Sequence, residues 1–222
     1  MDSCRLNGDS MKLGFNTQNY LVVNRQANQN KNTSSSRQDV SFGDSLGIIK
    51  PEVMHLEKDI LKLIKDAGFE IVEMPAAKLS KDLVKQHYSQ LRQKAASMFM
   101  GGNNSLMNIY RRVENNMLKG SSKVFVVKGD EAEVLRFKDF VGATVSSKRD
   151  PNSLRAIIEK MEVERLQKSG ASQKKIDKFR ATFSFVHASD ADWFDKAQTI
   201  KNYDREIKLH NPEYYDKFIA QK

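Results

Sequence analysis

Apolar and polar positions follow two different periods along the chain from residue 46 onward. Residues 46–49 form a short apolar run that predicts a strand, which Lys50 and Pro51 close. In the next segment apolar residues recur every three to four positions, which predicts a helix ending at Gly68. Residues 69–74 then alternate and predict a second strand. The apolar positions of the intervening helix are Leu56, Ile60, Leu63, Ile64 and Ala67.

The same two periods predict the elements of the second half of the chain. Capping patterns and glycines mark where its helices begin and end. We expect a helix capped by Ser80, a helix over 106–118, a strand over 123–127, a helix that Asp130 and Glu133 open and Gly142 ends, a helix from Leu154 that runs into the polar segment 162–178, a strand over 182–186 and a last helix from Asp190.

This order of elements predicts the fold class. Four strands separated by helices suit an α+β ferredoxin-like sandwich, in which helices pack on one face of a four-stranded, mostly antiparallel sheet. A doubly wound parallel sheet is the alternative, but four strands are few for that fold.

Composition divides the chain into a tail and a domain. We expect residues 1–45 to be disordered, because residues 24–41 are rich in Asn, Gln, Ser and charge. Residues 46–222 suffice for one domain. The single cysteine, Cys4, cannot form an internal disulfide, and we find neither an apolar run of 18 residues nor a secretory h-region. We therefore expect a cytoplasmic protein that does not enter the membrane.

The net charge of +9 and the pI of about 9.5 favour polyanionic partners such as nucleotides or nucleic acids. A solvated, lysine-rich surface explains the same excess equally well.

The sequence around His187 carries the main chemical signal. His187 follows the apolar residues 183–186, and Ser189 with Asp192 three residues later is typical of a helix start. A neutral imidazole is a good nucleophile at neutral pH. Helix N-termini offer N–H groups to anionic oxygens. A histidine beside a buried strand is nevertheless often only structural, so position alone does not decide its role.

Several cationic residues that could neutralise phosphate precede His187 in the sequence. Lys50 closes a strand, and Lys138, Arg149 and Arg155 lie on either side of Thr144. Phosphoryl transfer depends mainly on positioning and charge neutralisation, so cations that converge on one nucleophile would suit it. Each of them could equally be a surface residue.

Seven short blocks follow one another along the domain: Ile48–Pro51, Ala67–Phe69, His87–Tyr88, Gly142–Thr144, Leu154–Ala156, His187–Asp190 and Arg205–Ile207. In these blocks the chain resembles the nucleoside diphosphate kinases. The resemblance covers residues 46–222 in outline, and the shared order of the blocks is its strongest point.

The resemblance implies a role for each matching residue. His187 would be the phosphorylated nucleophile, and Glu206 would hold its other ring nitrogen. The enzyme would run a ping-pong reaction in which a nucleoside triphosphate phosphorylates the histidine and a diphosphate removes the phosphate. Mg²⁺ would be held mainly by the nucleotide phosphates, and a homo-oligomer is expected. The implied nucleotide contacts are Lys50 and Tyr88 at the phosphates and the nucleophile, Thr144 and Arg155 at phosphate, Lys138 where the family has arginine, Ser184 at the sugar, Ser189 beside the histidine and Phe99 as the nearest base-stacking aromatic.

Departures from the family pattern predict reduced activity. Ser184 stands where the family has an asparagine, and Ala188 replaces a glycine. Lys138 in place of arginine loses a bidentate fork. Insertions are expected near residues 93–119, 160–180 and 193–203.

Two other functions stay open beside the kinase. One is a nucleotide-binding or interaction module on the same fold with little or no turnover. The other is nucleic-acid binding by the basic segment 168–178, which has four lysines but only one neighbouring aromatic residue, Phe179.

Overall fold

The computed structural model describes residues 44–102, 104–182, 184–189 and 196–220. The predicted disordered tail over residues 1–45 lies outside this part of the chain, apart from its last two residues. The predicted start of the last helix at Asp190 also lies outside it. No helix in the described ranges is long and apolar enough to cross a membrane.

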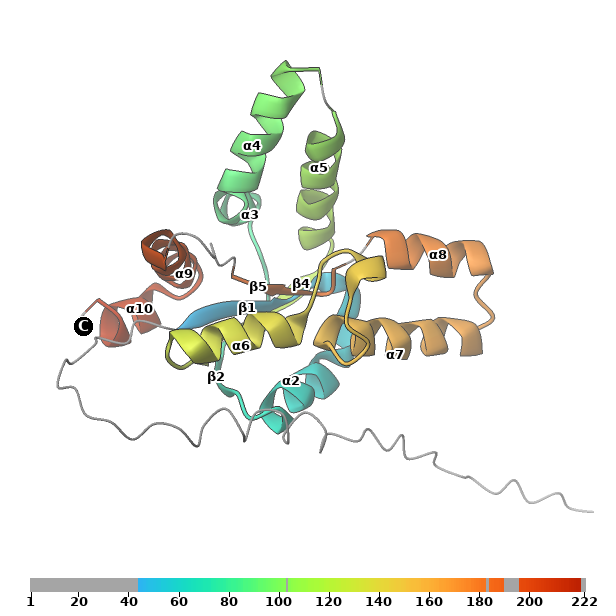
Figure 1. Cartoon of the computed structure of the whole chain (residues 1–222). Helices are drawn as coiled ribbons and strands as arrows, with labels where there is room; N and C mark the ends of the chain where they lie inside the picture. Colours follow the sequence, from blue (N-terminus) through green and yellow to red (C-terminus); the bar gives the residue numbers. More distant parts are fainter. Residues whose placement is uncertain (1–43, 103, 183, 190–195, 221–222) are drawn as a thin grey trace, which may run out of the picture. The chain divides into compact units, whose positions relative to one another are not determined.

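One antiparallel sheet carries the fold (Figure 1). Its strands are β1 (Ser45–Ile49), β2 (Glu70–Glu73), β4 (Ser121–Lys128) and β5 (Val186–Ala188), in the order β2-β4-β1-β5. The short strand β3 (Ala77–Lys78) pairs with the beginning of β4. Two central strands flanked by two others, with helical connections, form the predicted α+β ferredoxin-like arrangement.

Helices connect and cover the strands. Their sequence order follows the predicted alternation of strands and helices, with additional helices between residues 81 and 182. They are η2 (Pro51–Leu56), α2 (Glu57–Asp66), α3 (Lys81–His87), α4 (Ser89–Met100), α5 (Ser105–Met117), α6 (Glu131–Val141), η3 (Ser146–Lys148), α7 (Leu154–Lys168), α8 (Gln173–Thr182), α9 (Lys196–His210) and α10 (Pro212–Phe218).

Helices cover both faces of the sheet, whereas the sequence analysis expected helices on one face. Successive β4 side chains point to opposite faces. Phe125 and Val127 pack in a core with α2, α6, α7 and α8, whereas Val124 and Val126 pack in a second core with α3, α5, α9 and α10. Figure 1 shows α4 and α5 as a hairpin that projects from the second face.

Side chains cap the starts of four helices in the described part of the chain, among them α3 and α6. The Ser80 hydroxyl accepts the Leu83 N–H at 3.1 Å, and the Asp130 carboxylate accepts the Glu133 N–H at 2.9 Å. Both predicted caps are therefore confirmed. Gly142, with a φ of +81°, ends α6 as predicted, in a backbone conformation that favours glycine.

The predicted strand over residues 182–186 is wrong. Helix α8 continues to Thr182, and the strand is Val186–Ala188. Phe185 explains the break, because its φ of +59° interrupts the extended backbone. The Val186 N–H donates to the Ser184 carbonyl at 2.7 Å, which closes a tight turn. Phe185 and Val186 are therefore both buried in the core, although the turn prevents them from lying in one continuous strand.

Gly47 offers a direct test of the packing of the sheet. A Cβ atom at Gly47 would lie 2.1 Å from the Phe125 ring, which packs against it from the neighbouring strand. We predict that Gly47→Ala lowers the free energy of unfolding by about 1–3 kcal/mol, as overpacking usually does. Urea denaturation measures this. Gly101→Ala is the matched control, since its Cβ would meet only ordinary contacts. Equal stability of Gly47→Ala and wild type would contradict this packing.

Candidate active site

His187 lies in the middle of β5 and pairs with Ile48 of β1. Its Nε2 atom is 3.1 Å from an Oε2 atom of Glu206 on α9. The Ser189 hydroxyl donates to the same carboxylate oxygen at 2.6 Å. The structure thus brings together His187, Ser189 and Glu206, three of the residues selected from the sequence.

The ionisation state of Glu206 determines which group donates the hydrogen bond between His187 and Glu206. Burial alone would raise the pKa of Glu206. However, the charges of His187 and His87 and the hydrogen bonds from His187 and Ser189 lower it to about 2. An ionised carboxylate only accepts hydrogen bonds, so Nε2 of His187 is the donor. The lone pair of the neutral ring therefore resides on Nδ1, the nucleophilic atom that this arrangement provides.

Backbone contacts hold Ser189 beside this carboxylate. The Ser189 N–H donates to the Leu46 carbonyl at 3.1 Å, and the Leu46 N–H donates to the Ser189 hydroxyl at 3.2 Å. Ser189 is 1% exposed. The end of β5 is thus fixed to β1 by both its backbone and its side chain.

Tyr88 reaches the same site from the junction of α3 and α4. Its ring centroid lies 6.2 Å from that of His187 in an edge-on arrangement. Its neighbour His87 is closer, with a centroid distance of 4.5 Å to His187. His87 in turn contacts His210, whose Nε2 atom is 3.1 Å from His87 Nδ1. The sequence analysis assigned no role to either His87 or His210. The adjacency of His87 to Tyr88 was the only signal available.

Lys50 forms a second part of the site together with Ser184. The Lys50 Nζ atom donates to the Ser184 hydroxyl at 2.6 Å, and the Lys50 N–H donates to the Phe185 carbonyl at 2.9 Å. Lys50 is 7% exposed. Burial lowers its pKa to about 8, the charge of Glu52 acts in the opposite direction, and the charge of Arg155 lowers it further.

Arg155 is buried and organises the backbone around Ser184. Its guanidinium donates to the carbonyls of Gly142, Ser184 and Val186, and its Nη1 atom lies 3.4 Å from the Thr144 hydroxyl. It therefore joins the end of α6, the turn before β5 and the start of α7. The predicted phosphate contacts Thr144 and Arg155 are brought together, but the Arg155 N–H groups point to backbone oxygens.

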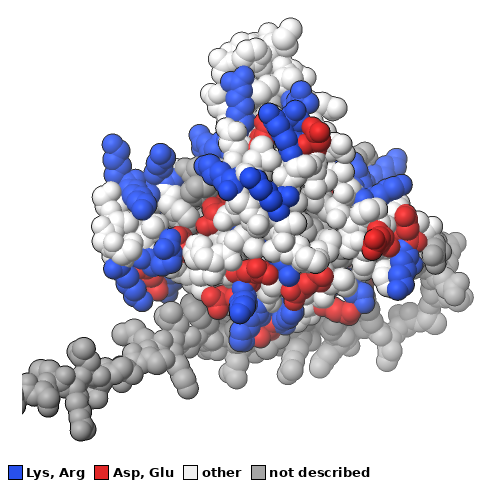
Figure 2. All heavy atoms as spheres, turned by 180° about the vertical axis from the view of Figure 1, so that it is seen from behind, with Lys and Arg blue, Asp and Glu red and all other residues white. Residues whose placement is uncertain are grey.

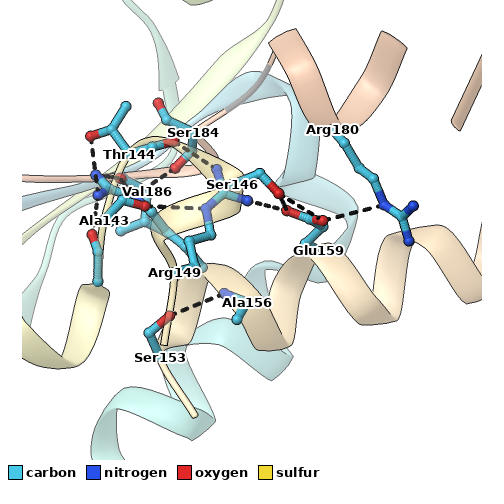
Figure 3. Close-up of polar contacts among 12 residues, drawn as sticks. Ala143, Thr144, Ser146, Arg149, Ser153, Ala156, Glu159, Arg180, Ser184 and Val186 are labelled. Carbon is cyan, nitrogen blue, oxygen red and sulfur yellow. Dashed lines mark hydrogen bonds and ion pairs between the residues drawn. The ribbon is translucent and has the colours of Figure 1, made fainter. Parts of the chain in front are cut away.

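Arg149 has a similar structural role (Figure 3). It donates to the carbonyls of Ala143 and Thr144 and pairs with Glu159 of α7. Glu159 also accepts from the Ser146 hydroxyl and lies 3.3 Å from Arg180 of α8. These contacts fix the loop that carries Thr144.

A cavity of about 590 Å³ lies beside this loop, and Thr144 and Ser184 both line it. Its apolar lining comes from α5 and the loop, through Ile109, Val113 and Val145. This volume is in the range of small-molecule sites. The sequence argument missed the three apolar residues, because no local pattern shows that α5 lies across from residue 144.

Two further residues selected from the sequence, Phe99 and Lys138, lie on α4 and α6. Phe99 is in the last turn of α4, is 46% exposed and does not line the cavity. Lys138 is half-buried on α6, where its carbonyl accepts the Gly142 N–H. The structure thus gives Phe99 no place against the candidate nucleotide cavity.

The family follows from sequence comparison. The sequence profile described as Nucleoside diphosphate kinase matches residues 44–199. The chain belongs to the nucleoside diphosphate kinase family. No curated protein matches the sequence significantly.

Solved structures show the same fold. A nucleoside diphosphate kinase of Aquifex aeolicus is 20% identical, with a TM-score of 0.51 over 76% of this chain and 94% of the other. A transition-state mimic of the Borrelia burgdorferi nucleoside-diphosphate kinase with vanadate and ADP is 18% identical, with a TM-score of 0.51 over 75% and 84% of the two chains. The enzyme of Encephalitozoon cuniculi is 16% identical, with a TM-score of 0.51 over 81% and 97%.

The basic segment 168–178 lacks an available stacking side chain. It spans the end of α7 and most of α8. Phe179 is 8% exposed and stacks on Phe185 at a centroid distance of 5.1 Å, so its ring is used in the core. In Figure 2 acidic and basic side chains are mixed below the α4–α5 hairpin, whereas the α7–α8 end, on the left of the view, carries mainly basic side chains. Basic charge is therefore present at this segment, but no aromatic ring is available beside it for base stacking.

The depressed pKa of Glu206 makes its contribution to stability pH-dependent. The contribution is complete above the ordinary value of 4.5 and is lost as the pH falls toward about 2, where the folded carboxylate binds a proton. We predict that Glu206→Gln lowers the free energy of unfolding by about 1–3 kcal/mol at neutral pH. The difference from wild type should shrink across this acid range.

Urea unfolding at several pH values tests this prediction. Glu213→Gln, at an exposed carboxylate on α10, is the control. A difference between wild type and Glu206→Gln that stays constant from neutral pH to the acid end would contradict the assigned ionisation.

Proposed function

We propose that this protein transfers the γ-phosphate of a nucleoside triphosphate to a nucleoside diphosphate through a phosphohistidine at His187. The observation that carries the proposal is the hydrogen bond from His187 Nε2 to the ionised Glu206 carboxylate. It fixes the ring and leaves Nδ1 with the lone pair. Family membership adds to this argument, and cytoplasm remains the compartment expected from the sequence.

The proposed reaction has two symmetric steps. Nδ1 attacks the γ-phosphorus, the bond to the β–γ bridging oxygen breaks, and the nucleoside diphosphate leaves. Glu206 stabilises the positive charge that develops on the ring, because it accepts from the opposite nitrogen. A second diphosphate then attacks the phosphohistidine, and the nitrogen–phosphorus bond breaks. The ping-pong order follows, since one site serves both nucleotides.

Lys50 supplies charge on the same face of the sheet. It lies two residues beyond Ile48, the partner of His187, and its backbone is extended with φ −82° and ψ 159°. Side chains two residues apart along an extended chain share a face. We therefore assign Lys50 to the transferred phosphate, with the Thr144 and Ser184 hydroxyls in the adjoining cavity as further donors.

The donor set of the cavity fits a magnesium ion that arrives with the nucleotide. Mg²⁺ prefers oxygen ligands and usually keeps several waters and substrate phosphates. The lining offers the Asp177 carboxylate and the hydroxyls of Thr144 and Ser184. These few oxygens suit an ion that the phosphates hold mainly, and the ion would neutralise phosphate charge there.

A nucleotide-binding module with weak turnover is the second candidate. The N–H groups of Arg155 point to three backbone carbonyls, and Arg149 pairs with Glu159. Guanidinium groups engaged in this way have fewer donors for a transition state. This arrangement favours reduced activity over a fully efficient enzyme.

Incubation with ATP labelled at the γ-phosphate tests the proposal. We expect label on the protein that survives alkaline separation, as phosphohistidine does, and that leaves when a nucleoside diphosphate is added. His187→Ala should carry no label, whereas His55→Ala, which changes a half-exposed histidine paired with Glu162, should be labelled like wild type. Label that persists in His187→Ala would refute the assignment. Nucleotide binding without any label would favour the second candidate.

Ser184 gives a test of the nucleotide cavity. An asparagine there can still accept from Lys50 and reaches further into the space that Ser184 lines. We predict that Ser184→Asn tightens ADP binding by about 2- to 10-fold, equal to one added hydrogen bond of roughly 0.5–1.5 kcal/mol. Calorimetric titration with ADP measures the change. An unaltered dissociation constant would mean that the sugar is bound elsewhere.

A further inference from the structure

Three side chains of types that commonly bind metal ions lie close together beside β5, where His187 is located. A ring nitrogen of His87, a ring nitrogen of His187 and a carboxylate oxygen of Glu206 all lie within 4.8 Å of one another. His87 comes from α3, which is distant in sequence from the consecutive elements β5 and α9 that carry the other two. The phosphoryl-transfer mechanism uses His187 and Glu206 but gives His87 no task.

His87 has an unsatisfied ring nitrogen. It is 4% exposed, and its Nε2 atom is buried with no hydrogen-bond partner. Leaving a buried polar atom unpaired costs about 1–3 kcal/mol, so such an atom calls for an explanation. Burial, followed by the charge of His187, lowers the pKa of His87 well below its usual value, so the ring is neutral. A neutral imidazole is the form that coordinates metals.

The other nitrogen of His87 has the partner that a metal-bound histidine requires. Its Nδ1 atom is 3.1 Å from Nε2 of His210. In one of the two tautomeric arrangements, the Nδ1–H of His87 donates to Nε2 of His210. That tautomer leaves the lone pair of His87 on Nε2. Metal-binding histidines usually donate their second N–H in this way, which fixes the ring.

We propose that His87, His187 and Glu206 form a site for a divalent transition-metal ion of the zinc class. Two imidazoles and one carboxylate are a ligand set that zinc uses, whereas magnesium prefers oxygen alone. The fourth position would face solvent beside His187, whose side chain is 13% exposed. The ion is therefore distinct from the magnesium that accompanies nucleotides.

The spacing of the ligands allows such an ion after a small adjustment. In a tetrahedral site zinc lies about 2.0–2.2 Å from each nitrogen or oxygen ligand, which places two ligand atoms about 3.3–3.6 Å apart. The three ligand atoms lie within 4.8 Å of one another, so rotations of the side chains that close at most about 1.5 Å bring them to this spacing. The hydrogen bond between His187 and Glu206 would give way to coordination.

Metal binding would withhold His187 from phosphate. A ring nitrogen and the orienting carboxylate would both be ligands, so the ring could not keep the orientation that nucleophilic attack needs. This consequence rests on the proposed phosphotransfer at His187, whereas the site itself does not. Zinc and the γ-phosphate would then compete for one histidine, which makes the ion an inhibitor.

Calorimetric titration with Zn²⁺ tests the site directly. All samples carry Cys4→Ser, so that the thiol does not contribute. We expect one ion per chain, and no binding at this site in His87→Phe, which keeps a flat ring but removes the lone pair. His210→Ala should weaken binding on the order of 10- to 100-fold, as loss of an orienting partner does. His55→Ala is the control and should bind like the parent.

Two results would overturn the metal site. One is the absence of stoichiometric binding to the folded parent protein. The other is undiminished binding in a folded His87→Phe, with folding checked by thermal melting. Zn²⁺ should also prevent labelling of the protein by γ-labelled ATP, and a chelator should restore it. If the protein binds Zn²⁺ through His87 but is never labelled, the metal site stands and the proposed transferase fails.

Discussion

The contact between His187 and the buried carboxylate of Glu206 is the constraint on which the site depends. A charge that is 5% exposed must be compensated by hydrogen bonds, and His187 and Ser189 supply them. His187 lies in β5 and Ser189 directly follows it, and the pairing of this segment with β1 holds both donors in place. The orientation of the imidazole is therefore a consequence of how the last strand and α9 pack together.

Most cations near the site serve the fold as well as the candidate chemistry. Arg155 joins three backbone segments, and Arg149 holds the loop that carries Thr144. Lys50 is engaged with Ser184, and burial lowers its pKa to about 8. This arrangement keeps charge beside the cavity but directs many donors inward. A family member built in this way has the groups for phosphoryl transfer with fewer donors aimed at the substrate.

Local sequence patterns predicted the sheet, the order in which its strands follow one another along the chain, and several helix ends. The caps at Ser80 and Asp130 depend on residues only three positions apart, which a sequence displays directly. The strand before His187 was wrong because Phe185 has a positive φ in a turn that Lys50 and Arg155 contact from elsewhere in the chain.

The sequence likewise predicted only some residues of the candidate site. The block around His187 and the acid at Glu206 could be selected by family resemblance. The contact between His87 and His210 joins residues 123 positions apart, and neither lies in a pattern that predicts it. Phe99 was the nearest aromatic residue in sequence, but the length of α4 carries it into an exposed position.

The protonation state of the His187 ring is the most direct test of this account. Nitrogen-15 spectra of protein labelled in the imidazole rings distinguish the two neutral tautomers, and loss of a signal in His187→Ala assigns it. The account predicts that neutral His187 carries its proton on Nε2, because that atom donates to Glu206. A proton on Nδ1 would leave no lone pair there for phosphate and would contradict the proposed mechanism.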